Sequence, residues 1–215
     1  MAGAPTVSVL IPCYNAEKYI GETLESVLKQ TWPSLEVIVV DDGSTDGSAG
    51  VVSRFSRENL KYILQANAGA AAARNRAVRQ SRGDFIQFLD ADDLLDRDKI
   101  ERQMARLEGR PDCVASAEWG RFDGDPANAR FEPEPVWRDL PPMDWLAATI
   151  ASGGMMFPAL WLVPRSVAMA AGSILKPGYL TLPGTLYFTN SLTLNGGSTN
   201  YFKLSSTNTI GSGVC

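Results

Sequence analysis

Three aspartates that directly follow an apolar run are the clearest candidates for chemistry in this sequence. The run FIQFL, residues 85–89, leads into Asp90, Asp92 and Asp93, which form a DxDD pattern. Mn²⁺ and Mg²⁺ prefer carboxylate oxygen, often one or two carboxylates completed by substrate phosphate. A DxD pair could therefore hold a metal ion that bridges a diphosphate and neutralises it as a leaving group. The alternative is a loop that only caps the next helix, which suits Asp96 better than the whole cluster.

Two further carboxylates end a second apolar run. Asp41 and Asp42 follow LEVIVV, residues 35–40. Adjacent carboxylates repel each other and lose hydration at a buried strand end, so a donor-rich partner is expected. A base ring N–H or a ribose hydroxyl could supply those donors. The alternative is that Asp41, Ser44 and Asp46 make only turn and helix-cap hydrogen bonds.

Phosphate binding, if present, needs a route other than a glycine-rich loop. The first expected strand-to-helix turn, residues 12–16 (PCYNA), has no glycine, and the chain has no GxxxxGK[ST] motif. These absences disfavour a dinucleotide site of the GxGxxG type and exclude a P-loop. Metal ions are the expected alternative.

Arg74, in the segment AAAARNRAV, is a further candidate for phosphate binding, because it could pair with a diphosphate if it points into the site. The alternative is that Arg74 lies on a solvated face of its helix.

The amino-acid composition removes several other kinds of chemistry. The 215 residues include no histidine, which excludes Ser-His-Asp triads, zinc sites with His ligands and His general bases. The three cysteines, Cys13, Cys113 and Cys215, are far apart, which argues against a disulfide framework or a cysteine metal site. The net charge of −4 argues against nucleic acid as a partner. The start of the chain lacks a signal-peptide pattern and no apolar run reaches membrane-span length, so a cytoplasmic location is expected.

The candidate residues lie at the ends of elements that alternate in type. Apolar runs predict strands at residues 7–12, 35–40, 60–64 and 85–89. Helices are expected after a cap at Asn15, over residues 46–56, and from Asn67 to a left-handed Gly83. This alternation predicts an α/β fold whose parallel sheet is covered on both faces. Ligands bind such sheets at the carboxyl ends of the strands, so the polar clusters should line one crevice.

The charge distribution divides the chain into two parts. All 24 Asp and Glu residues fall at or before Asp144, and after residue 172 the only charged side chains are Lys176 and Lys203. Residues 173–215 are rich in Thr, Ser, Asn, Gly and Leu, with short alternating runs between residues 180 and 204 that predict β-hairpins. The sequence therefore predicts an acidic α/β unit at 1–172 and, at 173–215, a tail of unknown origin that is either β-prone or disordered.

Taken together, these elements resemble the family 2 glycosyltransferases, which have the GT-A fold. The resemblance rests on three segments in the family's order, within about residues 6–100: VSVLIPCYNAEKYIGETLESVLKQTWPSLEVIVVDDGSTDGS, NAGAAAARNRAV and GDFIQFLDADD. As a set they are highly specific, although any one alone would be weak. The likeness extends more loosely to about residue 172, and the tail resembles no family.

The resemblance implies an inverting sugar transfer to an acceptor hydroxyl from a UDP-, GDP- or dTDP-linked sugar, with Mn²⁺ or Mg²⁺. The implied nucleotide-sugar residues are Pro12, Tyr14, Asn15, Asp41, Asp42, Arg74 and Asp90, and the implied metal residues are Asp90 and Asp92. Asp42 would contact the base or ribose. Trp161 would line the acceptor side, with core packing as the alternative. The resemblance also suggests cell-surface polysaccharide biosynthesis, in the cytoplasm or at the inner membrane face.

The catalytic base is where the chain departs from the family pattern. Inverting transfer needs a group that deprotonates the acceptor, and in this family it is a carboxylate after the acceptor-side strand. No carboxylate follows Asp144 here, which leaves Glu118 and Asp123 as weak candidates. Impaired transfer is therefore expected. The alternative is a non-catalytic nucleotide-sugar-binding module, and a nucleotidyltransferase is a weaker rival because the first turn lacks a Gly-rich basic loop.

Self-association is a further expectation from the acceptor side. Met155, Met156, Phe157 and Trp161 form an apolar stretch that the unusual tail is expected to cover poorly. Exposed apolar surface of this kind favours contacts between chains. The acceptor itself, whether glycan, lipid or protein, is not specified by these residues.

Overall fold

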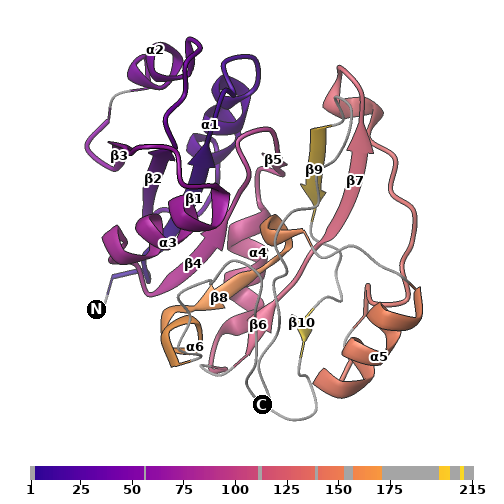
Figure 1. Ribbon diagram of the computed structural model, residues 1–215. Coiled ribbons are helices and arrows are strands. Elements are labelled where there is room, and N and C mark those ends of the chain that lie inside the picture. Colours follow the sequence, from indigo (N-terminus) through magenta and orange to yellow (C-terminus); the bar gives the residue numbers. More distant parts are fainter. Residues whose placement is uncertain are drawn as a thin grey trace.

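The computed structural model describes residues 3–55, 57–110, 113–138, 140–152, 157–170, 199–203 and 209–210. The first half of the chain forms β1 (Val7–Cys13), α1 (Ile20–Leu28), β2 (Leu35–Asp41), α2 (Ser48–Ser53), β3 (Leu60–Leu64), α3 (Ala70–Gln80), β4 (Phe85–Phe88), β5 (Leu94–Leu95) and α4 (Lys99–Leu107). The second half forms β6 (Val114–Ala115), β7 (Glu118–Phe122), α5 (Pro142–Ser152), β8 (Leu162–Pro164), α6 (Arg165–Ala170), β9 (Thr199–Lys203) and β10 (Thr209–Ile210), with 3-10 turns η1 (Pro126–Asn128) and η2 (Pro158–Leu160). Figure 1 shows their arrangement.

The central sheet has the strand order β10-β6-β8-β4-β1-β2-β3. Strands β1 to β4 pair in parallel, and β8 joins the edge of β4 in the antiparallel sense. From β1 the chain continues outward to β2 and β3 on one side and returns to β4 on the other. The direction of strand order therefore reverses between β1 and β4, the position where open α/β sheets bind ligands beyond their carboxyl ends.

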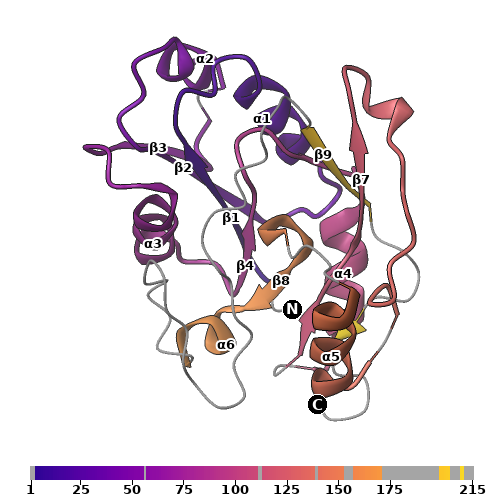
Figure 2. The same ribbon diagram turned by 45° about the vertical axis from the view of Figure 1, so that its right-hand side comes forward.

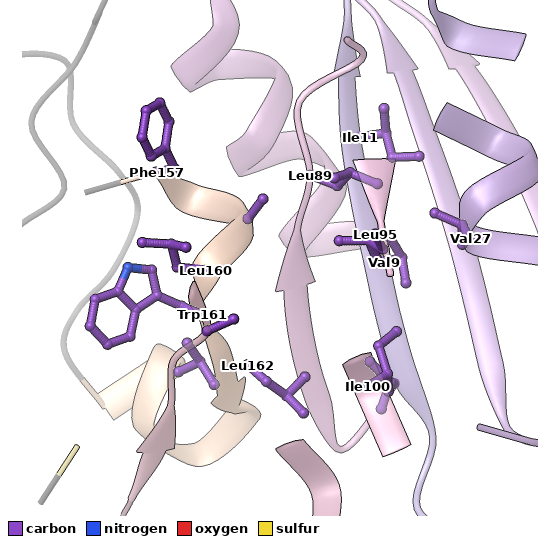
Figure 3. Packing of buried hydrophobic residues seen from close by; sticks show 14 of the residues in the cluster. Val9, Ile11, Val27, Leu89, Leu95, Ile100, Phe157, Leu160, Trp161 and Leu162 are labelled. Atoms are coloured by element: carbon purple, nitrogen blue, oxygen red, sulfur yellow. The ribbon is translucent and has the colours of Figure 1, made fainter. Parts of the chain in front are cut away.

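Both faces of β1, β2 and β4 are largely buried, which explains the continuous apolar sequences of these three strands. Ala73, Ala77 and Val78 of α3 pack in one cluster with Leu10 of β1. On the opposite face, α1 and α4 pack against alternate residues of the same strands, including Val9 and Ile11. Figure 2 shows α3 and α4 on opposite sides of the strands, and Figure 3 shows the second cluster from close by. Parallel strands covered on two faces need apolar residues at successive positions, as observed here.

Two expected helix boundaries are wrong for identifiable reasons. Helix α1 begins at Ile20 with Tyr19 at its N-cap, so Asn15 does not cap it. Helix α3 ends at Gln80, and Gly83 is not among the described residues with a positive φ. Gly83 instead lies against the backbone that leads into β1. A Cβ added there would meet the Ser8 nitrogen and the Thr6 oxygen, each at 2.8 Å, so close approach explains the glycine.

Gly83→Ala should therefore lower the free energy of unfolding by at least about 2 kcal/mol, because backbone atoms must move to admit a methyl group. Gly50→Ala is the matched control, since its added Cβ meets nothing within 4 Å and helix propensity favours alanine. Urea titration of both variants measures the difference. Equal stability of the two would contradict the steric explanation.

The described parts of the tail pair with the rest of the chain. Strand β9 lies between β5 and β7, and β10 pairs with β6. The hairpins expected at residues 180–194 lie outside the described residues. The structure shows Cys13 as a free, buried thiol and Cys113 as disulfide-bonded, a bond that the sequence argument against a disulfide framework did not anticipate. Among the described helices, none combines the length and the apolar character that crossing a membrane requires.

Candidate functional site

Helix α3 and the end of β4 bring two of the predicted site residues into contact. The Nη2 atom of Arg74 lies 2.5 Å from Oδ1 of Asp90, and the two side chains are 16% and 32% exposed. The pair lies beyond the carboxyl end of β4, next to the point where the strand order reverses. The Arg74 Nε atom is buried and has no hydrogen-bond partner among the described residues. Arg74 therefore has a donor left for an additional acceptor, such as a phosphate oxygen.

Asp92 extends this site with a second carboxylate. Its side chain is exposed, yet the surrounding protein reduces its solvation and raises its pKa, and the nearby Asp90 carboxylate raises that pKa further. Two carboxylates that repel each other in this way favour a bound cation. Asp93, by contrast, is 2% exposed. Asp90 and Asp92 thus suit a divalent metal ion.

A metal ion at this position would need ligands from another molecule. Within the described residues, no group of three or more Asp, Glu, Cys or His side chains is arranged to hold a metal. Mg²⁺ and similar ions are often held by one or two carboxylates together with substrate phosphates and water. The residues present therefore fit a metal that binds together with a phosphorylated ligand.

Asp42 is buried and accepts hydrogen bonds from the loop before α3. Its side chain is 2% exposed, and its oxygens accept from Gln65 Nε2 at 2.6 Å, Ala68 N at 2.9 Å and Gly69 N at 2.7 Å. Gly69 is the residue before α3, so the negative charge also lies at the favourable end of that helix. Asp42 therefore positions the helix that carries Arg74.

Asp41 is also buried and bonded within the chain. Its Oδ1 accepts from Ser44 N at 2.7 Å and its Oδ2 accepts from the Tyr62 hydroxyl at 2.5 Å. Burial and this hydrogen bond raise the pKa of Tyr62 far above its ordinary value. Asp46 accepts from Ser48 N at 3.0 Å. The turn bonds considered as the alternative for Asp41 and Asp46 are thus present, whereas the N-cap of α2 is Gly47, which has no side-chain cap bond.

The loop after β1 is held to the loop after β2. Asn15 has a φ of 49°, unusual for a residue other than glycine. Its Oδ1 accepts from Thr45 N at 2.8 Å, and its backbone N–H donates to Ser44 Oγ at 3.0 Å. Pro12 is buried under this loop, whereas the Tyr14 side chain is 53% exposed. The two loops together leave the Tyr14 ring at the surface beside the strand ends.

The acceptor-side candidates are more dispersed. Glu118 is half-buried at the start of β7, and Asp123 is exposed just after that strand. Trp161, labelled in Figure 3, is 1% exposed. Its indole makes an edge contact with Trp145, with ring centroids 5.2 Å apart. Core packing, the alternative considered for Trp161, therefore describes its position.

The apolar stretch from which self-association was predicted is partly buried in the structure. Phe157 is 6% exposed and Trp161 is buried, so these two residues are covered, contrary to expectation. Met155 and Met156 lie outside the described residues. Self-association itself stays a prediction.

Two contributors to this region escaped the sequence reasoning. Gln65 directly follows β3, and its side-chain amide donates to Asp42. Lys99 is fully buried although lysines usually lie at the surface. Neither has a local sequence signal, because each is defined by partners distant in the chain.

The fold is that of the GT-A glycosyltransferases. TarS of S. aureus, residues 1–349 in complex with UDP, matches with a TM-score of 0.61 and 26% identity, over 78% of this chain and 49% of that chain. The mannosyltransferase PcManGT from Pyrobaculum calidifontis, in complex with GDP-Man and Mn²⁺, matches with a TM-score of 0.56 and 25% identity, over 78% of this chain and 47% of that one.

The chain belongs to glycosyl transferase family 2, whose family model matches residues 8–157. TuaG of Bacillus subtilis, whose name assigns it to teichuronic acid biosynthesis, is 44% identical over 103 residues, which cover 46% of this chain and 41% of TuaG. The chain thus spans less than half the length of each of these three proteins.

Proposed function

We propose that this chain binds a nucleoside-diphosphate sugar together with Mn²⁺ or Mg²⁺ and acts in transfer of the sugar to an acceptor hydroxyl. The observation that carries the proposal is the Arg74–Asp90 pair with Asp92 beside it, at the reversal point of a GT-A sheet. The UDP bound to TarS and the GDP-Man and Mn²⁺ bound to PcManGT support this ligand class. Sugars linked to UDP, GDP and dTDP are therefore the donors to test for binding.

Each residue has a proposed role that follows from its position. Asp90 and Asp92 would hold the metal, which when bound supplies positive charge to the diphosphate. Arg74, held against Asp90, would contribute its positive charge to the same phosphate region. The exposed Tyr14 ring offers a stacking face for the base, and Asn15 holds the Tyr14 loop in place. Pro12 and Asp41 support these loops from beneath.

Asp92→Asn should weaken Mn²⁺-dependent UDP-sugar binding more than about tenfold, or ~1.4 kcal/mol, because one charged ligand is lost. Isothermal titration with and without EDTA measures this change. Asp125→Asn is the control, since Asp125 is exposed and only caps η1. Binding that is indifferent both to EDTA and to Asp92→Asn would refute the proposed metal site.

Asp42 is proposed to serve the nucleoside and not the metal. Its carboxylate has about four acceptor positions, of which the loop before α3 occupies three. Asp42→Ala should therefore weaken UDP and UDP-sugar binding to a similar extent, while the affinity of the ligand-free protein for Mn²⁺ changes little. Titration of each ligand separately checks this. A parallel loss of Mn²⁺ binding would place Asp42 in the metal site.

Donor binding with little transfer is the second candidate function. The observation that favours it is the position of the two candidate bases: Glu118 begins β7, a strand outside the central sheet, and Asp123 directly follows that strand. No carboxylate follows Asp144 in these 215 residues. General-base assistance contributes about 10²–10⁴-fold in rate. We propose that these 215 residues alone bind the donor and transfer the sugar slowly.

A labelled-sugar assay with glycan, lipid and protein acceptors, run beside a hydrolysis control, separates the two functions. Rapid transfer that is lost in Glu118→Gln or Asp123→Asn would assign the base and refute slow transfer. The TuaG name makes cell-surface polysaccharide precursors the first acceptors to try, and a location at the inner membrane face would suit them. We also propose that the glycosyltransferase-like unit ends near residue 172 and that the tail begins at residue 173.

A further inference from the structure

A fully buried lysine at the start of α4 is hydrogen-bonded to the side chains of two buried glutamines, one on β4 and one on α4. Lys99 begins α4, and its side chain has 0% exposure. Its Nζ donates to Gln87 Oε1 at 2.8 Å and to Gln103 Oε1 at 2.7 Å. Lys99, Gln87 and Gln103, all with 0% exposure, are called the Lys99 hub below.

The two glutamine amides of the hub connect it to the backbone of other segments. Gln87 Nε2 donates to the carbonyl oxygens of Phe88 at 2.6 Å and Ala159 at 2.9 Å. Gln103 Nε2 donates to the carbonyl oxygens of Ala115 at 3.1 Å and Leu160 at 2.9 Å. The hub thus ties β4, α4, β6 and η2 together through side-chain hydrogen bonds.

The segments joined by the hub lead to both sides of the proposed site. Strand β4 continues from Phe88 into Asp90 and Asp92, the proposed metal residues. The turn η2 precedes β8, the antiparallel strand in which Leu162 pairs with Gln87. The hub therefore lies where the strand with the metal residues meets the acceptor-side strand.

Packing alone does not account for a lysine at this position. A buried amine loses its hydration, and an apolar side chain of similar volume would avoid that penalty. No ion pair within the described residues includes Lys99. A neutral amine has two N–H donors, which match its two glutamine acceptors, and burial lowers the pKa of Lys99 well below its ordinary value. Fully satisfied buried networks of this kind fix a single arrangement of the segments they join.

We propose that Lys99 is a positioning residue: through Gln87 and Gln103 it fixes the end of β4 that carries Asp90 and Asp92 relative to the acceptor-side segment Ala159–Leu162. The catalytic consequence rests on the proposed function, whereas the coupling between the two segments does not. A substitution in the hub that raises local opening of the acceptor-side segment should therefore also raise local opening at the end of β4.

Hydrogen–deuterium exchange of the ligand-free chain tests this coupling. Gln103 hydrogen-bonds to Lys99, Ala115 and Leu160 but not to β4. Gln103→Met should nevertheless raise exchange about tenfold in residues 85–92 as well as in residues 157–164. Lys99→Met should do the same. Lys29→Met is the control, because Lys29 is exposed and pairs only with Glu25, and it should change neither segment.

The outcomes are distinguishable. Faster exchange confined to residues 157–164 in Gln103→Met would overturn the inference. An equal increase in β2, residues 35–41, would show global destabilisation and would overturn it as well. If Lys99→Met does not fold, Gln103→Met decides the question alone. Mn²⁺-dependent UDP affinity, measured on the same proteins, should fall severalfold in Gln103→Met. Absence of UDP binding by the wild type would refute the proposed function and leave the exchange result standing.

Discussion

Trp161→Ala should lower the free energy of unfolding by about 3–5 kcal/mol, the range for truncating a large aromatic side chain in a core. Trp161 is 1% exposed, and its indole contacts the edge of Trp145. Figure 3 shows it beside Leu160 and Leu162, next to the strand that pairs with β4. Removing the indole leaves a cavity between α5 and the sheet, which the surrounding backbone can close only partly.

Urea unfolding followed by far-ultraviolet circular dichroism measures this loss. Trp161→Phe is the matched variant, because it keeps an aromatic ring against Trp145, and its loss should be clearly smaller. If Trp161→Ala instead left stability unchanged and weakened only acceptor binding, the residue would line the acceptor side after all.

Below about pH 9 the free energy of unfolding of the wild type should rise as the pH rises, with a slope of at most about 1.4 kcal/mol per pH unit. Burial lowers the pKa of Lys99 well below its ordinary value. At any pH above the lowered pKa of the folded lysine and below its ordinary pKa, the unfolded lysine carries a proton that the folded lysine lacks. Because the unfolded state then binds more protons, raising the pH favours the folded state. Lys99→Met should remove this pH-dependent contribution.

The upper limit of the pH interval is set by Cys13. Burial, with a smaller contribution from Asp41, raises the pKa of Cys13 to about 11. Above pH 9 the folded thiol keeps a proton that the unfolded thiol loses, so stability then falls as pH rises. Urea titrations at half-unit pH steps, for wild type and Lys99→Met, isolate the lysine contribution. Superimposable profiles would mean that Lys99 keeps its charge in the fold.

Much of the parallel sheet could be predicted from local sequence. Strand β3 has the expected bounds, Leu60–Leu64, and β1, β2 and β4 differ from expectation by one residue. Buried parallel strands produce uninterrupted apolar runs, a signal that needs no knowledge of distant contacts. Helix ends were less predictable, because Gly83 serves close packing against Thr6 and Ser8 and not a helix cap.

The candidate site was predictable in position but not in its hydrogen bonds. The sequence placed Asp42, Asp90 and Asp92 at strand ends, since polar residues that follow apolar runs stand out. It did not show that Asp42 accepts from Gln65, Ala68 and Gly69, or that Arg74 meets Asp90. These partners are 16–27 residues apart in the chain, and only the packing of α3 on the sheet brings them together.

The sequence by itself thus determined the α/β class, the resemblance to family 2 glycosyltransferases and the strand-end location of the carboxylates, because each depends on local order along the chain. The tertiary structure alone decided that Trp161 packs in the core and that Lys99 is buried between two glutamines. Burial and pairing of that kind depend on which elements meet, and the closing of β4 against β8 brings distant segments together at this seam.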